Sequence, residues 1–100
     1  MKRLAVFSVF ITVIAGTAHA SAIKNACLSS DRAAGDRALC NCIQSAADRT
    51  LTQRDQRLAA TFFGDPSRAQ EIRQSSRRHH ESFWERYKNF GTAAETFCRH

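Results

Sequence analysis

Four cysteines, at positions 27, 40, 42 and 98, constrain the fold of this 100-residue chain more than any other feature. The chain after residue 20 holds few large apolar side chains, and a small core of this kind rarely supplies more than about 3–5 kcal/mol of net stability. Small exported domains commonly add disulfides, which persist in oxidising compartments. We therefore expect Cys27, Cys40, Cys42 and Cys98 to form two crosslinks, provided that the chain is exported.

The N-terminal segment predicts that export. Lys2-Arg3 precedes an apolar run from Leu4 to Ala15, and small residues follow at Ala18–Ala20. A basic start, a short apolar run and small residues at its end are the features of a secretory signal peptide. We expect residues 1–20 to be this signal peptide, with cleavage before Ser21.

Residues 21–100 are expected to form one helical domain outside the cytoplasm. The run Leu4–Ala15 is too short to stay in a bilayer as an anchor, because a spanning helix needs about 20 apolar residues. No later stretch is apolar and long enough to insert stably. A composition rich in Arg and Ala is typical of GC-rich bacterial genomes, so the expected compartment is the periplasm.

The sequence of this domain contains patterns that start and stop helices, and it lacks the patterns of strands. No valine follows Ser21, and neither Asn-Gly nor Asp-Gly turns occur. Apolar residues instead recur at helical spacing. We expect an all-α fold, a small disulfide-stapled bundle of four to five helices. The expected helices are 22–29, 36–51, 52–64, 66–90 and a short last helix from 92.

Capping residues set the expected boundaries. Thr52–Asp55 has the pattern of a capping box. Gly64 is expected to end its helix in the left-handed conformation, and Asp65-Pro66 to start the next as N-cap and first residue. Gly91 is expected to close the long helix, and Thr92–Glu95 to open the last one.

Helix geometry limits how the cysteines pair. Cys40 and Cys42 point about 200° apart around one helix, so a bond between them requires unwinding that helix. Each is expected to bond one of the outer cysteines, Cys27 and Cys98. Both pairings of this kind remain open, and folding back across Asp31–Gly35 slightly favours Cys27–Cys40 with Cys42–Cys98.

The close pair Cys40 and Cys42 also suggests an alternative function, thiol-redox chemistry or metal binding. The C-x-C spacing lacks the C-x-x-C pattern of zinc sites, and no second cysteine pair completes a tetrahedral site. It also lacks the C-x-x-C-H sequence of haem attachment. Structural disulfides are therefore favoured, and no metal or other cofactor is expected.

A basic and aromatic stretch is the leading candidate for partner binding. Thirteen basic residues against nine acidic ones follow residue 20, a formal charge of +4 that attracts anions. Arg73, Arg77 and Arg78 are expected to form a face for a protein or anionic partner, with Trp84 beside them as a stacking surface. The signatures of nucleic-acid modules are lacking, so no specific nucleic-acid partner is expected.

The same helix is expected to bury one face. His80 lies on it, and a histidine at a core-facing position is a candidate pH sensor. The alternative is a histidine that hydrogen-bonds a carbonyl at the edge of the core. Arg77–Glu81 and Glu85–Lys88 have ion-pair spacing on the other side of the helix. The expected core-facing residues are Ala69, Ile72, Ser76, His80, Phe83, Tyr87 and Phe90.

Catalysis is not expected. The chain has no G-x-S-x-G elbow, no glycine-rich phosphate loop and no identifiable nucleophile with a positioned base. These observations favour a small binding or interaction protein over an enzyme. A protein that maintains the cell envelope without a small ligand is another alternative.

Residues 40–44 (Cys-Asn-Cys-Ile-Gln), 55–66 and 83–87 (Phe-Trp-Glu-Arg-Tyr) resemble a group of small exported bacterial proteins of unknown function. The similarity covers most of the chain after the signal peptide, and some members carry the label "arginine transporter". The resemblance implies no site residues, because none is established for the group. An accessory role linked to that label is a further alternative, although a transporter itself needs several spanning helices.

Overall fold

The computed structural model describes residues 5–6, 8–10, 21–31, 33 and 35–98, which form five α-helices and no strand. The all-α fold predicted from the sequence is confirmed. The predicted signal peptide, residues 1–20, lies outside the described residues except at positions 5, 6 and 8–10. The helices are α1 (Ala22–Ser29), α2 (Arg37–Thr50), α3 (Gln53–Gly64), α4 (Pro66–Gln74) and α5 (Arg78–Phe97).

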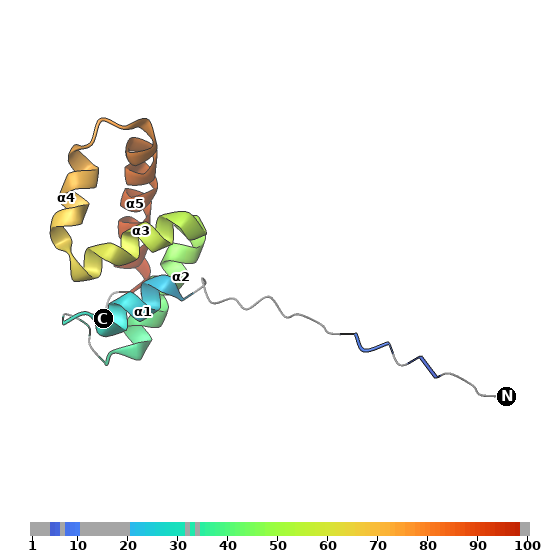
Figure 1. Cartoon of the computed structure of the whole chain (residues 1–100). Coiled ribbons are helices and arrows are strands. Elements are labelled where there is room, and N and C mark those ends of the chain that lie inside the picture. Colours follow the sequence, from blue (N-terminus) through green and yellow to red (C-terminus); the bar gives the residue numbers. More distant parts are fainter. Residues whose placement is uncertain (1–4, 7, 11–20, 32, 34, 99–100) are drawn as a thin grey trace.

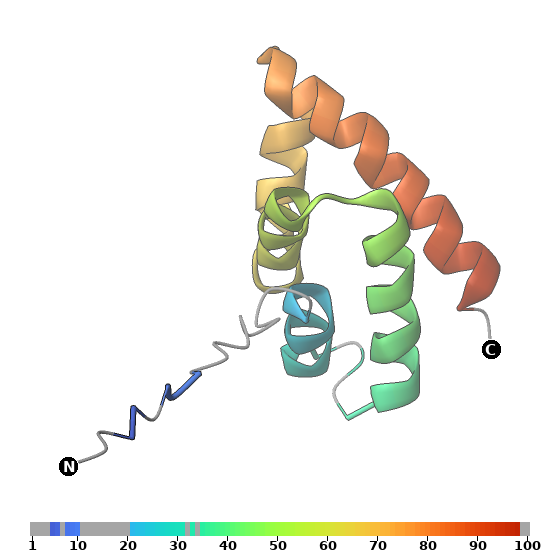
Figure 2. The same ribbon diagram turned by 90° about the vertical axis from the view of Figure 1, so that its right-hand side faces the viewer.

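The five helices form two groups joined by α5. In Figure 1, α4 and the first half of α5 run side by side from α3 to a connector at their far end, while α1 and α2 lie on the other side of α3. Figure 2 shows α5 leaning across the molecule, so that its last turns lie beside α2. The longest helix therefore links both groups.

An aromatic cluster fills the space between α3 and α5. The ring of Phe62 stands nearly perpendicular to those of Phe83 and Tyr87, with centroids 5.9 and 5.3 Å away. Such edge-to-face pairs add about 0.5–1.5 kcal/mol each beyond the area they bury. The cluster continues into a core with members from every helix: Ile23, Ala46, Ala47, Leu51, Ala59, Phe62, Ile72, Phe83 and Phe90.

The predicted starts of three helices are confirmed. The Asp36 carboxylate accepts the Leu39 N–H at 3.0 Å and caps α2. Thr52 and Asp55 form the expected capping box at α3, each side chain accepting the other's backbone N–H at 3.1 Å. Pro66 opens α4. Asp65 precedes α4 as expected but makes no side-chain cap hydrogen bond, so side-chain caps mark the starts of α2 and α3 only.

The continuous helix predicted over 66–90 is wrong, because residues 75–77 divide it into α4 and α5. Ser75 has extended backbone angles, and its Oγ accepts the Arg77 N–H at 3.2 Å. In one straight helix, Ile72 and Phe83 would lie about 16 Å apart along the axis. The break folds α5 back along α4, so that both side chains enter the same core.

The predicted end of α3 at Gly64 is confirmed, but the left-handed cap there and the helix end at Gly91 are wrong. Gly91 does not close a helix, since α5 continues through it to Phe97. A helical glycine costs about 1 kcal/mol, but burial of Phe90 and the bond from Cys98 to α2 hold this turn in place. Gly64 is the last residue of α3 and has no left-handed backbone. The chain turns at Asp65 instead, because a residue before proline favours an extended backbone.

Two disulfides join the helices in the favoured pairing. Cys27–Cys40 ties α1 to α2, and Cys42–Cys98 ties α2 to the end of α5, with Cα–Cα distances of 5.6 and 5.7 Å. Bonds of this kind persist in oxidising environments. In the described part of the chain, no helix has an apolar stretch long enough to cross a membrane.

A polar network connects α1, α2 and α3. Gln44 Oε1 accepts the Lys24 N–H at 2.8 Å, in the first turn of α1, where backbone donors lack helical partners. Gln44 Nε2 donates to Gln56 Oε1 and to Asp48 Oδ1, both at 2.8 Å. Gln56 is 1% exposed and Gln44 is 7% exposed. The network therefore fixes how the three helices align.

Replacing Gln44 with leucine is expected to lower the free energy of unfolding by about 2 kcal/mol, because the part-buried Lys24 N–H and the buried Gln56 Oε1 lose the partner that Gln44 gives them. Urea unfolding followed by circular dichroism measures this change. Gln53→Leu is the matched control, since Gln53 is exposed at the start of α3 and its replacement is expected to change stability by less than about 0.5 kcal/mol. Equal effects of the two substitutions would show that the network contributes nothing.

Candidate functional site

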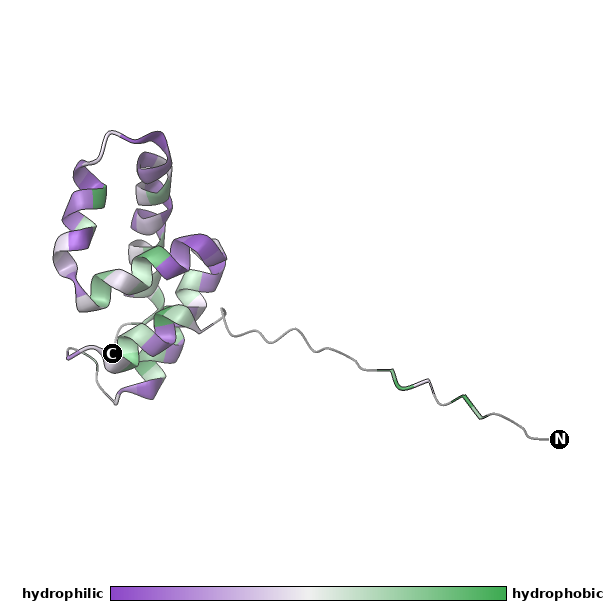
Figure 3. Ribbon diagram, viewed as in Figure 1, coloured by the Kyte–Doolittle hydropathy of each residue, from purple (hydrophilic) through white to green (hydrophobic). Residues whose placement is uncertain are grey.

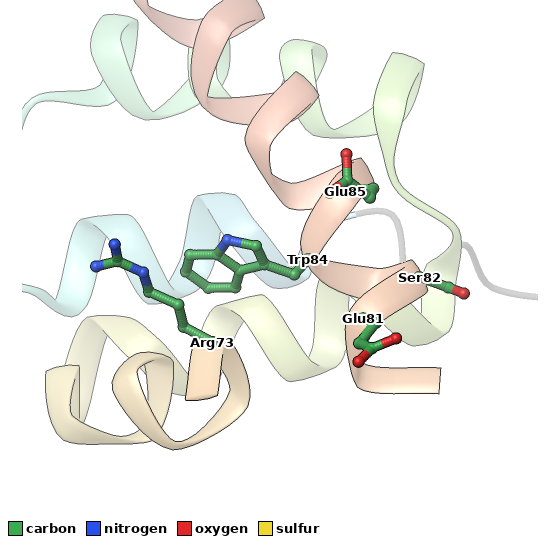
Figure 4. A pocket seen from close by; sticks show the side chains of 5 residues that line it. All are labelled: Arg73, Glu81, Ser82, Trp84 and Glu85. Atoms are coloured by element: carbon green, nitrogen blue, oxygen red, sulfur yellow. The ribbon is translucent and has the colours of Figure 1, made fainter. Parts of the chain in front are cut away.

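The break between α4 and α5 creates a corner at which predicted partner-binding residues meet. Arg73 from the last turn of α4 and Trp84 from α5 line one shallow hollow of about 390 Å³. Figure 4 shows the Arg73 guanidinium beside the edge of the indole ring. The structure thus brings together two of the four residues singled out for partner binding. We call Arg73, Arg77, Arg78 and Trp84 the corner surface.

Trp84 is held in place by the core. Its ring is half-buried, and its centroid lies 5.1 Å from that of Tyr87, which packs in turn against Phe62. Arg73 is exposed, so its position depends on α4 and not on burial. The hollow therefore combines a rigid aromatic wall with a long cationic side chain that is free to adjust.

Arg77 and Arg78 lie at the start of α5 and do not line this hollow. Both are exposed, and no ion pair of Arg73, Arg77 or Arg78 occurs among the described residues. The predicted Arg77–Glu81 pair is wrong, because Arg77 precedes the helix with an extended backbone. Three cationic side chains around the corner are therefore available to a partner.

Two carboxylates missed by the sequence interpretation share the hollow. Glu81 and Glu85 line it together with Ser82, one turn apart on the Trp84 side of α5. Glu85 also forms the predicted ion pair with Lys88, at 2.9 Å. The spacing of Glu81, three residues before Trp84, was the available signal in the sequence. The surface is consequently mixed in charge, which reduces its attraction for a free polyanion.

No family model, curated protein or solved structure matches the chain. The case for a function therefore depends on the geometry of the chain itself.

His80, the predicted pH sensor, lies at the same corner. Its ring is half-buried, and Nδ1 is 2.7 Å from Ser75 Oγ, the hydroxyl that also accepts the Arg77 N–H. Burial lowers the pKa of His80 below its ordinary value, and the positive charges of His79, Arg77 and Arg68 lower it further. The neutral ring is thus favoured where the chain turns from α4 into α5.

Acidification is expected to weaken this corner. Because the pKa of His80 is lowered on folding, the unfolded chain binds more protons below about pH 6.5, and the free energy of unfolding falls as the pH drops from about 7 to about 5. His80→Gln keeps a hydrogen-bonding group for Ser75 and is expected to lose less stability over that interval. Urea unfolding at a series of pH values measures both slopes, and equal slopes would contradict the prediction.

Cys40 and Cys42 lie outside this corner and belong to different disulfides. Cys40 is fully buried, whereas Cys42 is partly exposed. Neither offers a free thiol in this arrangement, and the described residues contain no group of three potential metal ligands. The geometry of the corner surface therefore supports a function more directly than the cysteine pair does.

Proposed function

We propose that this protein is a small binding module of the bacterial periplasm that recognises a partner protein through the corner surface. The observation that carries the proposal is the meeting of Arg73 and Trp84, from different helices, in one open hollow. Trp and Arg are the residue types most enriched among the energetically dominant contacts of protein interfaces. A rigid indole beside unpaired arginines suits a partner that presents a carboxylate next to an apolar side chain.

The mixed charge of the hollow favours a protein over a polyanion. Glu81 and Glu85 repel a uniform anion, but a protein surface can offer a cation to them and a carboxylate to Arg73. Opposed charges also discriminate against wrong partners, because a like charge at either position is costly. The two glutamates therefore contribute to specificity in this proposal.

Crosslinking in intact cells tests the proposal. A photoreactive amino acid at Ser82, which lines the hollow and is exposed, is expected to capture one predominant partner, whereas the same group at exposed Arg57 on α3 is not. Identical captures from both positions would contradict the proposal.

The captured complex then permits a charge-matched comparison. Arg73→Ala/Arg77→Ala/Arg78→Ala is expected to weaken binding of the purified partner about 30-fold, as expected for loss of a dominant contact. The control removes three exposed arginines elsewhere and should leave binding unchanged; its substitutions are Arg37→Ala, Arg54→Ala and Arg57→Ala. Equal weakening by both variants would show that binding depends only on the net charge of the protein. Unchanged binding of the corner-surface variant would show that these arginines do not contact the partner. Either result would contradict the proposal.

A further inference from the structure

A second, larger hollow lies apart from the corner surface and shares no lining residue with it. Its volume is about 710 Å³, within the range of about 300–1,000 Å³ typical of small-molecule sites. All five helices contribute to its wall. We call it the groove.

The wall of the groove is mainly apolar. Leu39 and Ile43 of α2, Phe63 of α3 and Tyr87 of α5 line it, and each of these side chains is only partly buried by the protein. Figure 3 shows that hydrophobic residues are frequent on α1, α2 and α3, whereas α4 is hydrophilic along most of its length. A ligand in the groove would remove further apolar surface from water, at about 25 cal/mol for each Å² buried.

The described lining of the groove carries one negative charge. Asp31 is the only charged residue among the described residues that line it, and it is exposed. Ser30, the C-cap of α1, lies beside Asp31, and no basic residue occupies the last turn of that helix. The carbonyl end of a helix is itself negative. Among the described residues that line it, the groove therefore combines an apolar wall with a single charge, the negative one of Asp31.

We propose that the groove binds a small amphiphile with an apolar body and a single cationic head. The body lies between Ile43, Phe63 and Tyr87, and the head pairs with Asp31. The volume of the groove limits the ligand to a small molecule. The half-buried apolar side chains favour a ligand with an apolar body, and the charge of Asp31 favours a cationic head over an anionic one.

Binding of three ligands with the same alkyl chain tests the charge preference. Decylammonium, decanol and decanoate are titrated below their aggregation limits into the disulfide-bonded protein, by calorimetry. Decylammonium is expected to bind one site, about tenfold more tightly than decanoate, and Asp31→Asn is expected to remove most of that difference. Equal affinities for the cation and the anion in the unmodified protein would overturn the proposal.

Filling the groove tests its location. Gly64 lines the groove, and a Cβ built there meets no atom within 4 Å, so Gly64→Leu is expected to fold and to weaken decylammonium binding by roughly tenfold. Gly91→Leu is the matched control: Gly91 is also helical, its Cβ also meets no atom, and it does not line the groove. Thermal unfolding verifies that both variants fold. Unchanged binding to Gly64→Leu, or equal weakening in both variants, would show that the ligand binds elsewhere.

Discussion

Removing the Cys42–Cys98 bond is expected to lower the free energy of unfolding by about 4 kcal/mol, because the bond closes a loop spanning most of the folded chain. Cys98 holds the last turn of α5 against α2, where Phe97 is 65% exposed and offers little packing. Without the bond, the turns of α5 after Gly91 are expected to fray first.

The double variant Cys42→Ala/Cys98→Ala is the appropriate test, because it leaves no single thiol to form a wrong bond. Urea unfolding followed by circular dichroism measures its stability. Cys27→Ala/Cys40→Ala serves for comparison, with an expected entropic loss of about 3 kcal/mol from its shorter loop. A double variant at positions 42 and 98 with an unchanged midpoint would show that packing alone holds α5.

Asp55→Asn is expected to lower the free energy of unfolding by about 2 kcal/mol. Breaking a fully buried ion pair costs more, but Arg86 remains 41% exposed. Arg86 Nε and Nη2 donate to the two Asp55 oxygens at 2.7 and 3.0 Å, and the carboxylate also accepts the Thr52 N–H. An amide in its place keeps one acceptor and turns a donor toward the guanidinium. The substitution therefore weakens both the α3 cap and its link to α5.

The same pair makes stability depend on pH in the acidic range. Burial raises the pKa of Asp55, but the hydrogen bonds and charge of Arg86 and the Thr52 backbone outweigh burial and lower it overall. A lowered pKa in the folded state means that this stabilisation is complete above about pH 4 and is lost as the pH falls further. Asp55→Asn is expected to lose less stability than the unmodified protein as the pH falls below about 4. Asp36→Asn is the control, because asparagine caps a helix as well as aspartate. The same acid dependence in Asp55→Asn as in the unmodified protein would contradict this role.

Sequence reasoning succeeded where structure depends on neighbouring residues. The capping box at Thr52 and the helix start at Pro66 are fixed within one helical turn, so their patterns determine them. The opposed directions of Cys40 and Cys42 correctly excluded a bond between them, but they left two pairings open, and the structure shows the slightly favoured one.

The wrong predictions concern places where contacts between distant residues outweigh the conformation that the local sequence favours. Ser75 and Ser76 carry no strong helix-breaking signal, and the chain turns there because Ile72 and Phe83 share a core. Gly91 remains helical since its flanks are anchored.

The candidate sites were predictable only in part. The basic and aromatic composition pointed to Arg73 and Trp84, but their meeting in one hollow depends on the break in the helix. The ion pair of Asp55 and Arg86 joins residues 31 positions apart and leaves no local pattern. The groove likewise exists only after all five helices pack together.

The central claim is that two crosslinks, formed outside the cytoplasm, hold together a bundle with a small core. Mass spectrometry of the protein recovered from its own cells, with thiols blocked at lysis, tests it most directly. The account predicts a periplasmic chain beginning at Ser21, with a mass four hydrogens below the reduced value and peptides joined as Cys27–Cys40 and Cys42–Cys98. A folded cytoplasmic chain that retains residues 1–20 and carries a blocking group on all four cysteines would contradict it.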